Sequence, residues 1–373
     1  MNAWTTAMWY TINEVDKLDT PALVVYPERV KYNISLVKTM VDDVSRLRPH
    51  VKTHKSPDVT KLMLHAGIGK FKCATIAEAE MLGTCNAPDV LLAYQPNGPK
   101  LARFIRLIKT YPDTAFSCLV DNIGTANAIA EAALNDDLIV PVFIDLNIGM
   151  NRTGISPADA LELYQACAEI EGITIKGLHA YDGHIHDADY SARQQRSDES
   201  VEPVLALAMA IYDEGYPAPV VIAGGSPTFP IIAQRETIEC SPGTFAYWDR
   251  GYELAFEEQP FQTAALIIAR VVSLPDETKV CIDVGHKSVS AENELSKRIY
   301  FLNAPQLVFK SQSEEHLVAD AGPNHHFKVG DILYGLPNHI CPTIALYERA
   351  ITIEDQSITG EWLNVARDRK ITI

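Results

Sequence analysis

Up to about residue 260, the chain alternates between two hydrophobic patterns. The first pattern places apolar residues three or four positions apart, as Val30, Ile34 and Val37 are, and it is typical of a helix with one buried face. The segment 122–134 has the same spacing. A longer polar stretch that leads into an apolar run extends over 189–214. We therefore predict a helix in each of these three places.

The second pattern is a short apolar run, and such runs alternate with the helical stretches. Runs of this length between turn residues are typical of buried strands. The predicted strands occupy 46–52, 71–75, 89–93, 115–119, 140–145, 174–181, 219–223 and 237–240. Eight strands that alternate with helices over roughly 200–250 residues fit an α/β fold of the (β/α)₈ TIM-barrel type, and a doubly wound sheet is the competing solution. The number of strands leaves both open.

After about residue 262 the helical spacing fades, and strand-like runs such as KVCIDVG and GDILYGL follow one another. Short runs with Gly, Pro and Asn between them are typical of a compact antiparallel sheet. Because 373 residues exceed the size at which one hydrophobic core stops growing, we expect two domains. We predict a barrel over 21–262 and a C-terminal antiparallel β-domain over 263–373, with residues 1–20 packed on the β-domain.

Composition narrows the class of protein. Hydrophobic residues make up 47% of the chain and charged residues 21%, close to the average of a globular protein. The formal net charge of −16 disfavours nucleic acid and anionic membranes as partners, since both favour a basic surface. The start of the chain has no basic stretch followed by an apolar run, so we expect a cytoplasmic protein. Seven cysteines without a C-x-x-C pair indicate reduced thiols.

The first predicted strand carries an unusual row of cations. Arg48, His50, Lys52 and His54 alternate with less polar residues, so they share one face of the strand. The row has a structural explanation, because positive charge protects an edge strand from aggregation. In a barrel, however, the more apolar face would pack on the helices. The cationic row would then face the barrel axis and its mouth, where it suits an anionic ligand.

Other polar residues gather directly after predicted strands. The segments that follow the fifth, sixth, seventh and eighth strands are 148–154, 181–186, 224–228 and 241–244. The last two are rich in Gly, Ser and Thr, whose backbone and hydroxyl groups donate hydrogen bonds to phosphates. Barrels often bind phosphate in the loops after strands seven and eight. Read alone, however, a Gly-Gly-Ser-Pro-Thr segment is more typical of a turn than of a phosphate site.

Taken together, these features resemble the D-threonine aldolase / D-serine dehydratase family of pyridoxal-phosphate enzymes, which have an alanine-racemase-type barrel. The resemblance covers nearly the whole chain. The matching segments are T-P-A-L at 20–23, R-P-H-V-K-T-H-K at 48–55, N-R-T-G at 151–154, G-G-S-P-T at 224–228, S-E-E-H at 313–316 and P-N-H-I-C-P-T at 337–343. The resemblance implies the barrel fold, bound pyridoxal 5′-phosphate, a small D-amino acid as substrate and a homodimer.

The resemblance also implies roles for individual residues. Lys52 matches the lysine that holds the cofactor and acts as base at the substrate Cα, with Lys55 as the rival candidate. Arg152 matches the arginine near the cofactor's phenolic oxygen, and Tyr181 matches the ring-stacking position. The phosphate would be held by Gly225, Ser226, Thr228, Gly243 and Thr244. Alanine racemases have Arg-Pro-Gly where this chain has Ser-Pro-Gly at 241–243, which puts racemase chemistry in doubt.

A metal site is expected at His339 and Cys341. On a strand, residues two apart point the same way, and thiolate with imidazole suits zinc. Such a spacing alone is usually accidental, but the resemblance implies a divalent metal at this place. Dehydratases of the family resemble this chain in having His-x-Cys, whereas the aldolases typically have His-x-Asp. We therefore expect a lyase that dehydrates a D-3-hydroxy amino acid such as D-serine, D-threonine or threo-3-hydroxyaspartate.

Three other functions stay open on the sequence. The first is D-threonine aldolase, a retro-aldol enzyme that would use the same cofactor and metal. An amino-acid racemase is less favoured, because it needs a second acid–base group that the sequence does not identify. A carrier of pyridoxal phosphate without catalytic activity is typically a single barrel. The predicted β-domain with its His-x-Cys segment argues against that last interpretation.

Overall fold

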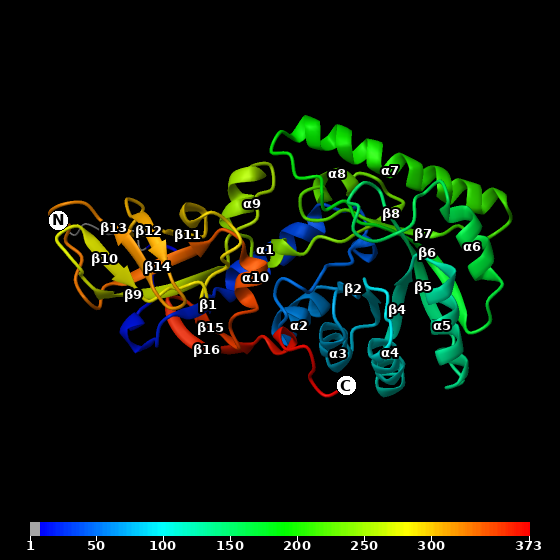
Figure 1. The fold of residues 1–373 in the computed structure, drawn as a ribbon, viewed down its shortest axis with the longest axis horizontal. Helices are drawn as coiled ribbons and strands as arrows, with labels where there is room; N and C mark the ends of the chain where they lie inside the picture. The colour runs from blue at the N-terminus through cyan, green and yellow to red at the C-terminus, as the bar shows by residue number, and fades with distance from the viewer. Residues whose placement is uncertain (1–7) are drawn as a thin grey trace. The chain divides into compact units, whose positions relative to one another are not determined.

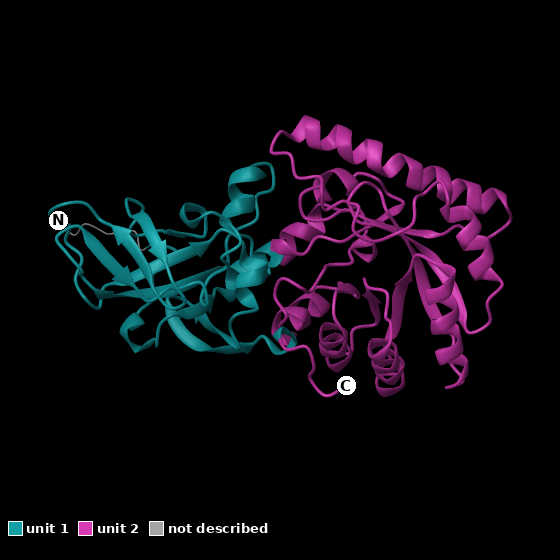
Figure 2. Ribbon diagram, viewed as in Figure 1, with its two compact units in different colours: residues 1–33, 246–367 teal, residues 34–245, 368–373 magenta. Residues whose placement is uncertain are grey.

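A computed structural model of the chain describes residues 8–373, and it divides the chain into two compact units (Figure 1, Figure 2). One unit, which we call the barrel unit, comprises residues 34–245 and 368–373. The other, the β-unit, comprises the chain up to residue 33 and residues 246–367. No helix within residues 8–373 is both long enough and apolar enough to cross a membrane.

The barrel unit is built on a sheet of seven parallel strands in the order in which they occur in the chain. These strands are β2 (Lys70–Cys73), β3 (Asp89–Leu92), β4 (Ala115–Val120), β5 (Val140–Leu146), β6 (Ile173–Ala180), β7 (Val220–Ala223) and β8 (Ile238–Cys240). Seven of the eight predicted strands therefore exist near the expected places. A cluster of Leu91, Leu119, Phe143 and Ile222 is buried between the strands.

The remaining predicted strand, over 46–52, closes the barrel without forming a regular strand. Leu47 bridges Cys240 of β8 and His50 bridges Lys72 of β2, both in parallel register. The Arg48 backbone N–H donates to the Cys240 carbonyl at 2.8 Å. The segment 47–50 thus fills the gap between the two edge strands, which confirms the (β/α)₈ barrel expected from the sequence.

Helices follow the strands and cover the sheet (Figure 1). They are α2 (Pro57–His65), α3 (Ile76–Thr84), α4 (Pro99–Thr110), α5 (Ile123–Leu134), α6 (Ala160–Ala168), α7 (Tyr190–Asp213) and α8 (Phe229–Ile232). Their starts are set by the local sequence, since Thr75, Asn122 and Asp189 each accept a backbone N–H of the first turn. The predicted helices over 122–134 and 189–214 are confirmed as α5 and α7.

The β-unit contains a nine-stranded, mostly antiparallel sheet. Its strands are β1 (Ala22–Val25), β9 (Ala265–Ser273), β10 (Lys279–Ile282), β11 (Ile299–Phe301), β12 (Val308–Gln312), β13 (Leu317–Asp320), β14 (Ile332–Pro337), β15 (Arg349–Glu354) and β16 (Ser357–Leu363). Short helices α9 (Arg250–Ala255) and α10 (Ile340–Ile344) belong to the same unit. The antiparallel β-domain expected after residue 262 is therefore present.

The boundaries drawn from the sequence at residues 20 and 262 differ from those of the two units. Strand β1 pairs with β9 and β15, so residues 22–25 belong to the sheet of the β-unit before the chain enters α1 (Pro27–Thr39). The helix predicted from Val30 onward is α1, and it runs across the division at Asn33. Residues 8–20 pack on this sheet through Ile12 and Leu18, whereas residues 1–7 lie outside the described part.

Candidate active site

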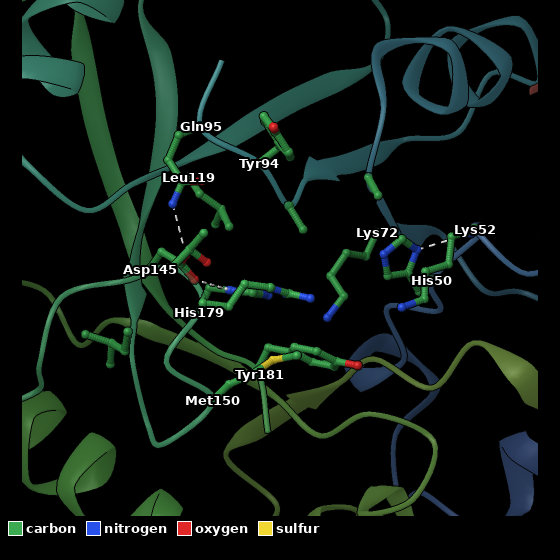
Figure 3. A pocket seen from close by; sticks show the side chains of 15 residues that line it. His50, Lys52, Lys72, Tyr94, Gln95, Leu119, Asp145, Met150, His179 and Tyr181 are labelled. Atoms are coloured by element: carbon green, nitrogen blue, oxygen red, sulfur yellow. Dashed lines mark hydrogen bonds and ion pairs between the residues drawn. The ribbon is translucent and has the colours of Figure 1, made fainter. Parts of the chain in front are cut away.

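Three of the residues assigned from the sequence meet at the carboxyl ends of the barrel strands. Lys52 lies in the turn after the closing segment, Arg152 in the loop after β5, and Tyr181 directly after β6. All three line one cavity of about 390 Å³ (Figure 3). This volume lies within the range of roughly 300–1,000 Å³ that is usual for small-molecule sites. The expectation that these residues share one barrel mouth is confirmed by their placement.

Cationic groups surround the ring of Tyr181. The Lys52 Nζ is 5.7 Å from the ring centroid, the Lys72 Nζ is 5.3 Å away, and the Arg152 guanidinium carbon is 5.3 Å away. Gly225 allows a loop to come this close to the ring, since a Cβ there would lie 3.2 Å from Tyr181 Cε2. The ring thus lies between the cations and the loop that follows β7.

The residues predicted to hold phosphate come together in two adjoining loops. The Ser226 hydroxyl oxygen accepts hydrogen bonds from the backbone N–H groups of Gly243 and Thr244, both at 3.1 Å. In the first loop, the Gly225 N–H and the Thr228 hydroxyl donate to the Asp182 carboxylate at 3.0 and 2.5 Å. These hydrogen bonds hold the two loops together, and the donors that form them have acceptors within the chain.

Asp182 is a site feature that the sequence reasoning missed. Its carboxylate is buried, and burial raises its pKa, although the hydrogen bonds from Thr228 and Gly225 favour the charged form. Asp182 directly follows Tyr181 in a segment already noted for its polarity. A carboxylate that accepts the donors of the Gly-rich loop fixes the conformation of that loop.

Lys52 and Lys55 differ in their partners. Lys55 forms an ion pair with the carboxylate of Glu78, a buried residue in the first turn of α3. No ion pair of Lys52 occurs within the described residues, and its side chain lines the cavity. Lys52, rather than Lys55, is therefore the lysine that is available to a ligand.

The cationic row predicted over 48–54 is only partly correct. The extended segment ends at His50, and residues 51–54 form a turn, so the alternation does not continue. His50 lines the cavity, and its Nδ1 accepts the Lys52 backbone N–H at 3.2 Å. His54 instead is fully buried, and burial lowers its pKa to about 3. Among the described residues, the bridges of this segment to β8 and β2 are at Leu47 and His50, and the chain turns directly after them.

His339 and Cys341 are not on a strand, which corrects the expectation from their spacing. His339 has extended backbone angles and forms the N-cap of α10, whose first turn contains Cys341. Burial lowers the pKa of His339, but hydrogen bonding to Cys341 and to the Glu292 carboxylate outweighs it and raises the pKa to about 9. The two candidate ligands are thus neighbours, with Glu292 at the other side of the imidazole.

A buried carboxylate holds the backbone of this segment. Asp249 accepts hydrogen bonds from the backbone N–H groups of Ile340 and Tyr252, both at 3.0 Å, and burial raises its pKa to about 6. Among residues 8–373, no group of three or more His, Cys, Asp or Glu side chains is arranged to hold a metal ion. A metal bound here would therefore have two protein ligands and open positions for other groups.

The sequence reasoning also missed three residues inside the cavity, which are Lys72 on β2, Asp145 on β5 and His179 on β6. A signal for His179 was present, since it precedes Tyr181 by two positions and so shares its face of the strand. For Lys72 the signal was a lysine inside a short apolar strand, in the segment KFKC. Neither lies in a motif that the resemblance covers.

Comparisons with known proteins agree with this architecture. Residues 25–250 match the family described as "Alanine racemase, N-terminal domain", and residues 264–353 match the "Putative serine dehydratase domain". The chain is 25% identical to a D-threonine aldolase of Arthrobacter sp over 94% of its length and 93% of the relative. It is also 25% identical to a D-threo-3-hydroxyaspartate dehydratase of Delftia sp. (strain HT23), over 88% of this chain and 93% of the relative.

A solved structure of D-threo-3-hydroxyaspartate dehydratase, a cysteine-to-alanine mutant in the metal-free form, has the same fold. Its TM-score is 0.83 at 22% identity, with 93% of this chain and 98% of that chain covered. The first family match spans more than half of the 373 residues. The chain therefore belongs to the alanine racemase N-terminal domain family, in the group of D-threonine aldolases and D-serine dehydratases whose barrel is joined to a serine dehydratase domain.

Proposed function

We propose that this protein is a pyridoxal-phosphate-dependent lyase that dehydrates a small D-3-hydroxy amino acid to an α-keto acid and ammonia. The observation that carries the proposal is the cavity in which Lys52, Arg152 and Tyr181 meet beside two loops rich in anion donors. An anionic, planar, aldehyde-bearing cofactor needs an amine, a cation, a flat ring and a phosphate cradle. The cavity offers the amine, the cation and the ring, and the loops after β7 and β8 would supply the cradle beside Tyr181.

The residues fit the cofactor as follows. Lys52 would bind the aldehyde carbon through its amine, because it has no competing ion pair within residues 8–373. Arg152 would stabilise the negative charge on the phenolic oxygen, and the Tyr181 ring would stack on the cofactor ring. When bound, pyridoxal phosphate withdraws electrons from the substrate and makes its Cα–H acidic. Lys52 would then act as the base that removes this proton.

The phosphate would lie between the loops after β7 and β8. Its donors would be the backbone N–H groups of Gly225, Gly243 and Thr244 with the hydroxyls of Ser226 and Thr228. Several of these groups donate to Asp182 or Ser226 in this structure, so phosphate binding would redirect them. Backbone donors at the carboxyl ends of barrel strands are a common phosphate site.

A divalent metal, zinc by its ligand chemistry, would bind through His339 and Cys341 and polarise the substrate's β-hydroxyl group. Glu292 contacts the Nδ1 of His339, and a carboxylate at one ring nitrogen commonly orients the other towards a metal. The metal-free form of the dehydratase described above indicates that metal binding occurs in a protein of this fold. Cys341 is our reason for proposing dehydration, and a retro-aldol reaction is the alternative.

The substrate and reaction are tested by incubating the purified protein, loaded with pyridoxal phosphate, with D-serine, D-threonine and D-threo-3-hydroxyaspartate. Dehydration of D-threonine gives 2-oxobutanoate and ammonia, and this is the expected result. Glycine and acetaldehyde as the main products would establish an aldolase instead. L-isomers serve as controls, and equal turnover of both isomers would contradict the proposed D-specificity.

The metal is tested separately. Chelation, His339→Ala and Cys341→Ala should each abolish turnover while the visible absorbance of the bound cofactor stays, and added zinc should restore the chelated enzyme. Cys281→Ala is the matched control, because Cys281 is also a half-buried thiol of the β-unit but lies on β10. Full activity of Cys341→Ala would remove the metal from the proposal. We further propose that the protein is cytoplasmic and forms a homodimer. Light scattering would test the homodimer by measuring the mass of the particle in solution.

A further inference from the structure

The cavity contains a second lysine that the proposed function does not use. Lys72 lies on β2 with only 2% of its surface exposed, and its Nζ is as close to the Tyr181 ring as that of Lys52 (Figure 3). No ion pair or hydrogen bond of the Lys72 side-chain amine occurs in the part of the chain that the structure describes. A buried amine without a carboxylate partner is costly, so its presence needs an explanation.

A histidine on β6 lines the same cavity. His179 is 4% exposed, and its Nδ1 is 2.8 Å from the Asp145 carboxylate, which also accepts a hydrogen bond from Gln95 at 2.9 Å (Figure 3). The other ring nitrogen, Nε2, is buried without a hydrogen-bond partner among the described residues. Asp145 therefore orients an imidazole whose second nitrogen is available to a ligand.

The surroundings of Asp145 and His179 determine which atoms of these two residues carry protons. Burial raises the pKa of Asp145, but the hydrogen bond from His179 and its other hydrogen bonds outweigh burial and lower it, so Asp145 is a carboxylate. A carboxylate only accepts hydrogen bonds, so the Nδ1 of His179 carries the proton. Burial, and then the charges of Lys72 and Arg152, lower the pKa of His179 despite Asp145. At neutral pH the Nε2 therefore presents a lone pair.

The groups that face Lys72 bring the pKa of its amine close to neutral pH. Burial is the largest cause and the charge of Lys52 the next, and together they lower the pKa of Lys72 to about 7. The charge of Arg48 lowers it further, while Asp182 and Asp145 raise it. His50 and His179 also face Lys72, and both are held neutral because burial lowers their pKa. The amine is thus able to gain or lose a proton under ordinary conditions.

We propose that Lys72 and the Asp145-oriented His179 form a second acid–base pair in the cavity, distinct from Lys52. The proposal rests on the proposed function, in that the ligand is the bound cofactor with its substrate. Lys72, as an ammonium, donates a proton to this ligand and is left as an amine. His179 accepts a proton from the ligand at Nε2 and is left as an imidazolium paired with Asp145. Lys52 remains assigned to the substrate Cα.

The first experiment needs no cofactor. Nitrogen-15 NMR of protein with labelled histidine should show one imidazole, absent from His179→Gln, with a protonated Nδ1 and an unprotonated Nε2 at pH 7. Carbon-13 NMR of labelled lysine should show one Cε signal, absent from Lys72→Met, that titrates near pH 7. A His179 that is cationic at pH 7, or lysines that all titrate near the ordinary value of about 10.4, would overturn the proposal.

The second experiment uses the holoenzyme with Lys72→Met, Lys72→Arg and the control Lys176→Met, which changes an exposed lysine on β6. Both Lys72 variants should keep the cofactor but lose at least about 10²-fold in kcat. Any ionisation of Lys72 in the pH profile should disappear in both variants, because methionine has no proton to exchange and arginine keeps its own. An unchanged profile in Lys72→Met would refute the pair.

The two experiments separate the inference from the function on which it rests. If the wild-type protein binds no pyridoxal phosphate, the proposed function fails, and the NMR titrations still decide whether the pair exists. If the cofactor binds and the substrate turns over while Lys72→Met and His179→Gln keep the wild-type pH profile, the proposed lyase function is supported. The proposed acid–base pair of Lys72 and His179 is then refuted.

Discussion

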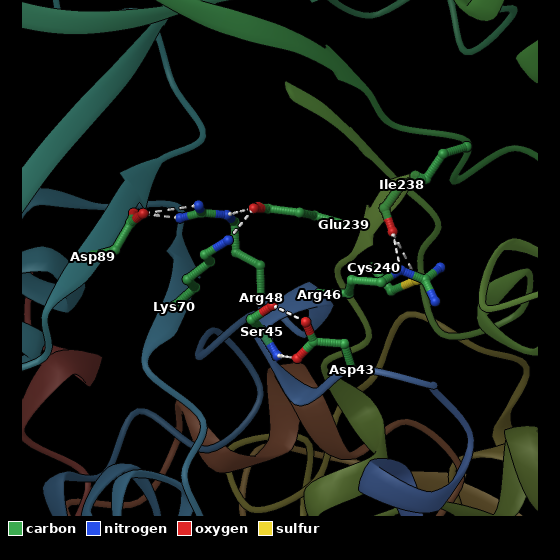
Figure 4. Close-up of polar contacts among 9 residues, drawn as sticks. All are labelled: Asp43, Ser45, Arg46, Arg48, Lys70, Asp89, Ile238, Glu239 and Cys240. Carbon is green, nitrogen blue, oxygen red and sulfur yellow. Dashed lines mark hydrogen bonds and ion pairs between the residues drawn. The ribbon is translucent and has the colours of Figure 1, made fainter. Parts of the chain in front are cut away.

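Two cationic side chains of the barrel unit are buried to the same extent but differ in whether carboxylates pair with them. Arg48 and Lys72 are each 2% exposed. Arg48 donates to Glu239 at 2.7 Å and to Asp89 at 2.5 and 3.0 Å, and Lys70 pairs with the same Glu239 (Figure 4). Lys72 has no ion pair within the described residues. The Arg48 cluster lies near the amino ends of β2 and β3, whereas Lys72 faces the cavity.

This difference separates structural charge from functional charge. A buried cation is tolerated when carboxylates and hydrogen bonds compensate it, and removing one partner of such a cluster is costly. In a barrel, the amino ends of the strands generally serve stability and the carboxyl ends serve ligands. Within residues 8–373, Lys52, Lys72 and Arg152 form no ion pair with a carboxylate because, in our proposal, an anionic ligand compensates them. The following predictions test this division, from the largest expected effect to the smallest.

The largest effect is expected for Lys52→Ala. Without the amine that binds the cofactor and moves the proton, turnover should fall at least about 10³-fold and the visible absorbance of bound cofactor should disappear. Lys55→Ala is the matched control, since Lys55 is three residues away but is paired with Glu78. Absorbance that survives in Lys52→Ala and is lost in Lys55→Ala would reverse the assignment.

Arg48→Met should cost about 3 kcal/mol or more in the free energy of unfolding, because it leaves Asp89 and Glu239 without their shared partner. Lys72→Met should cost nothing or stabilise the fold, because it removes a buried charge that has no carboxylate partner. Urea unfolding of the cofactor-free variants measures both. If the two substitutions lower the free energy of unfolding equally, the carboxylate partners of Arg48 do not account for a difference in stability between the two cations.

His54 should make the fold sensitive to acid. Its pKa is about 3 in the folded protein and about 6.5 in the unfolded chain, so between these values the unfolded chain binds one more proton. The free energy of unfolding should therefore decrease by up to about 1.4 kcal/mol per unit as pH falls from 6.5 towards 3. His54→Asn should reduce this slope, and His65→Asn, at an exposed position, should not. Equal slopes in all three proteins would exclude His54 as a source.

The smallest effect concerns Tyr181. Tyr181→Leu removes the ring that would stack on the cofactor and should weaken pyridoxal-phosphate binding about tenfold, which corresponds to roughly 1.4 kcal/mol. Tyr181→Phe keeps the ring and should change the affinity little. A spectroscopic titration of the cofactor-free protein measures both constants. A Phe variant as weak as the Leu variant would assign the contribution to the hydroxyl group instead.

Local patterns in the sequence were sufficient for most of the barrel. The spacing of apolar residues located α5 and α7, and short apolar runs located the strands, because burial of one face imposes a period of its own on each element. Polar segments directly after the predicted strands predicted where the mouth of the barrel lies, since parallel strands all end at one edge. Lys52, Arg152 and Tyr181 were found in this way, with the resemblance to a known family.

Where the sequence failed, long-range contacts decided the result. Among the described residues, the extended segment bridges other strands at Leu47 and His50, and His339 starts a helix whose backbone Asp249 holds from 91 residues away. The strand pattern gave no information about either contact. The barrel boundary drawn at residue 21 likewise placed β1 in the barrel, although its hydrogen-bond partners in β9 and β15 follow more than 200 residues later.

Within the barrel unit, the sequence by itself located most of the predicted helices and strands and the polar segments that follow the strands, since these patterns depend on neighbours within a few positions. Only the tertiary structure decided which cations are compensated. Arg48 and Lys72 are both buried basic side chains, and the residues next to them in the sequence do not reveal which of the two has carboxylate partners. Their difference arises because Asp89 and Glu239 reach Arg48 from other strands, whereas the space around Lys72 is left to a ligand.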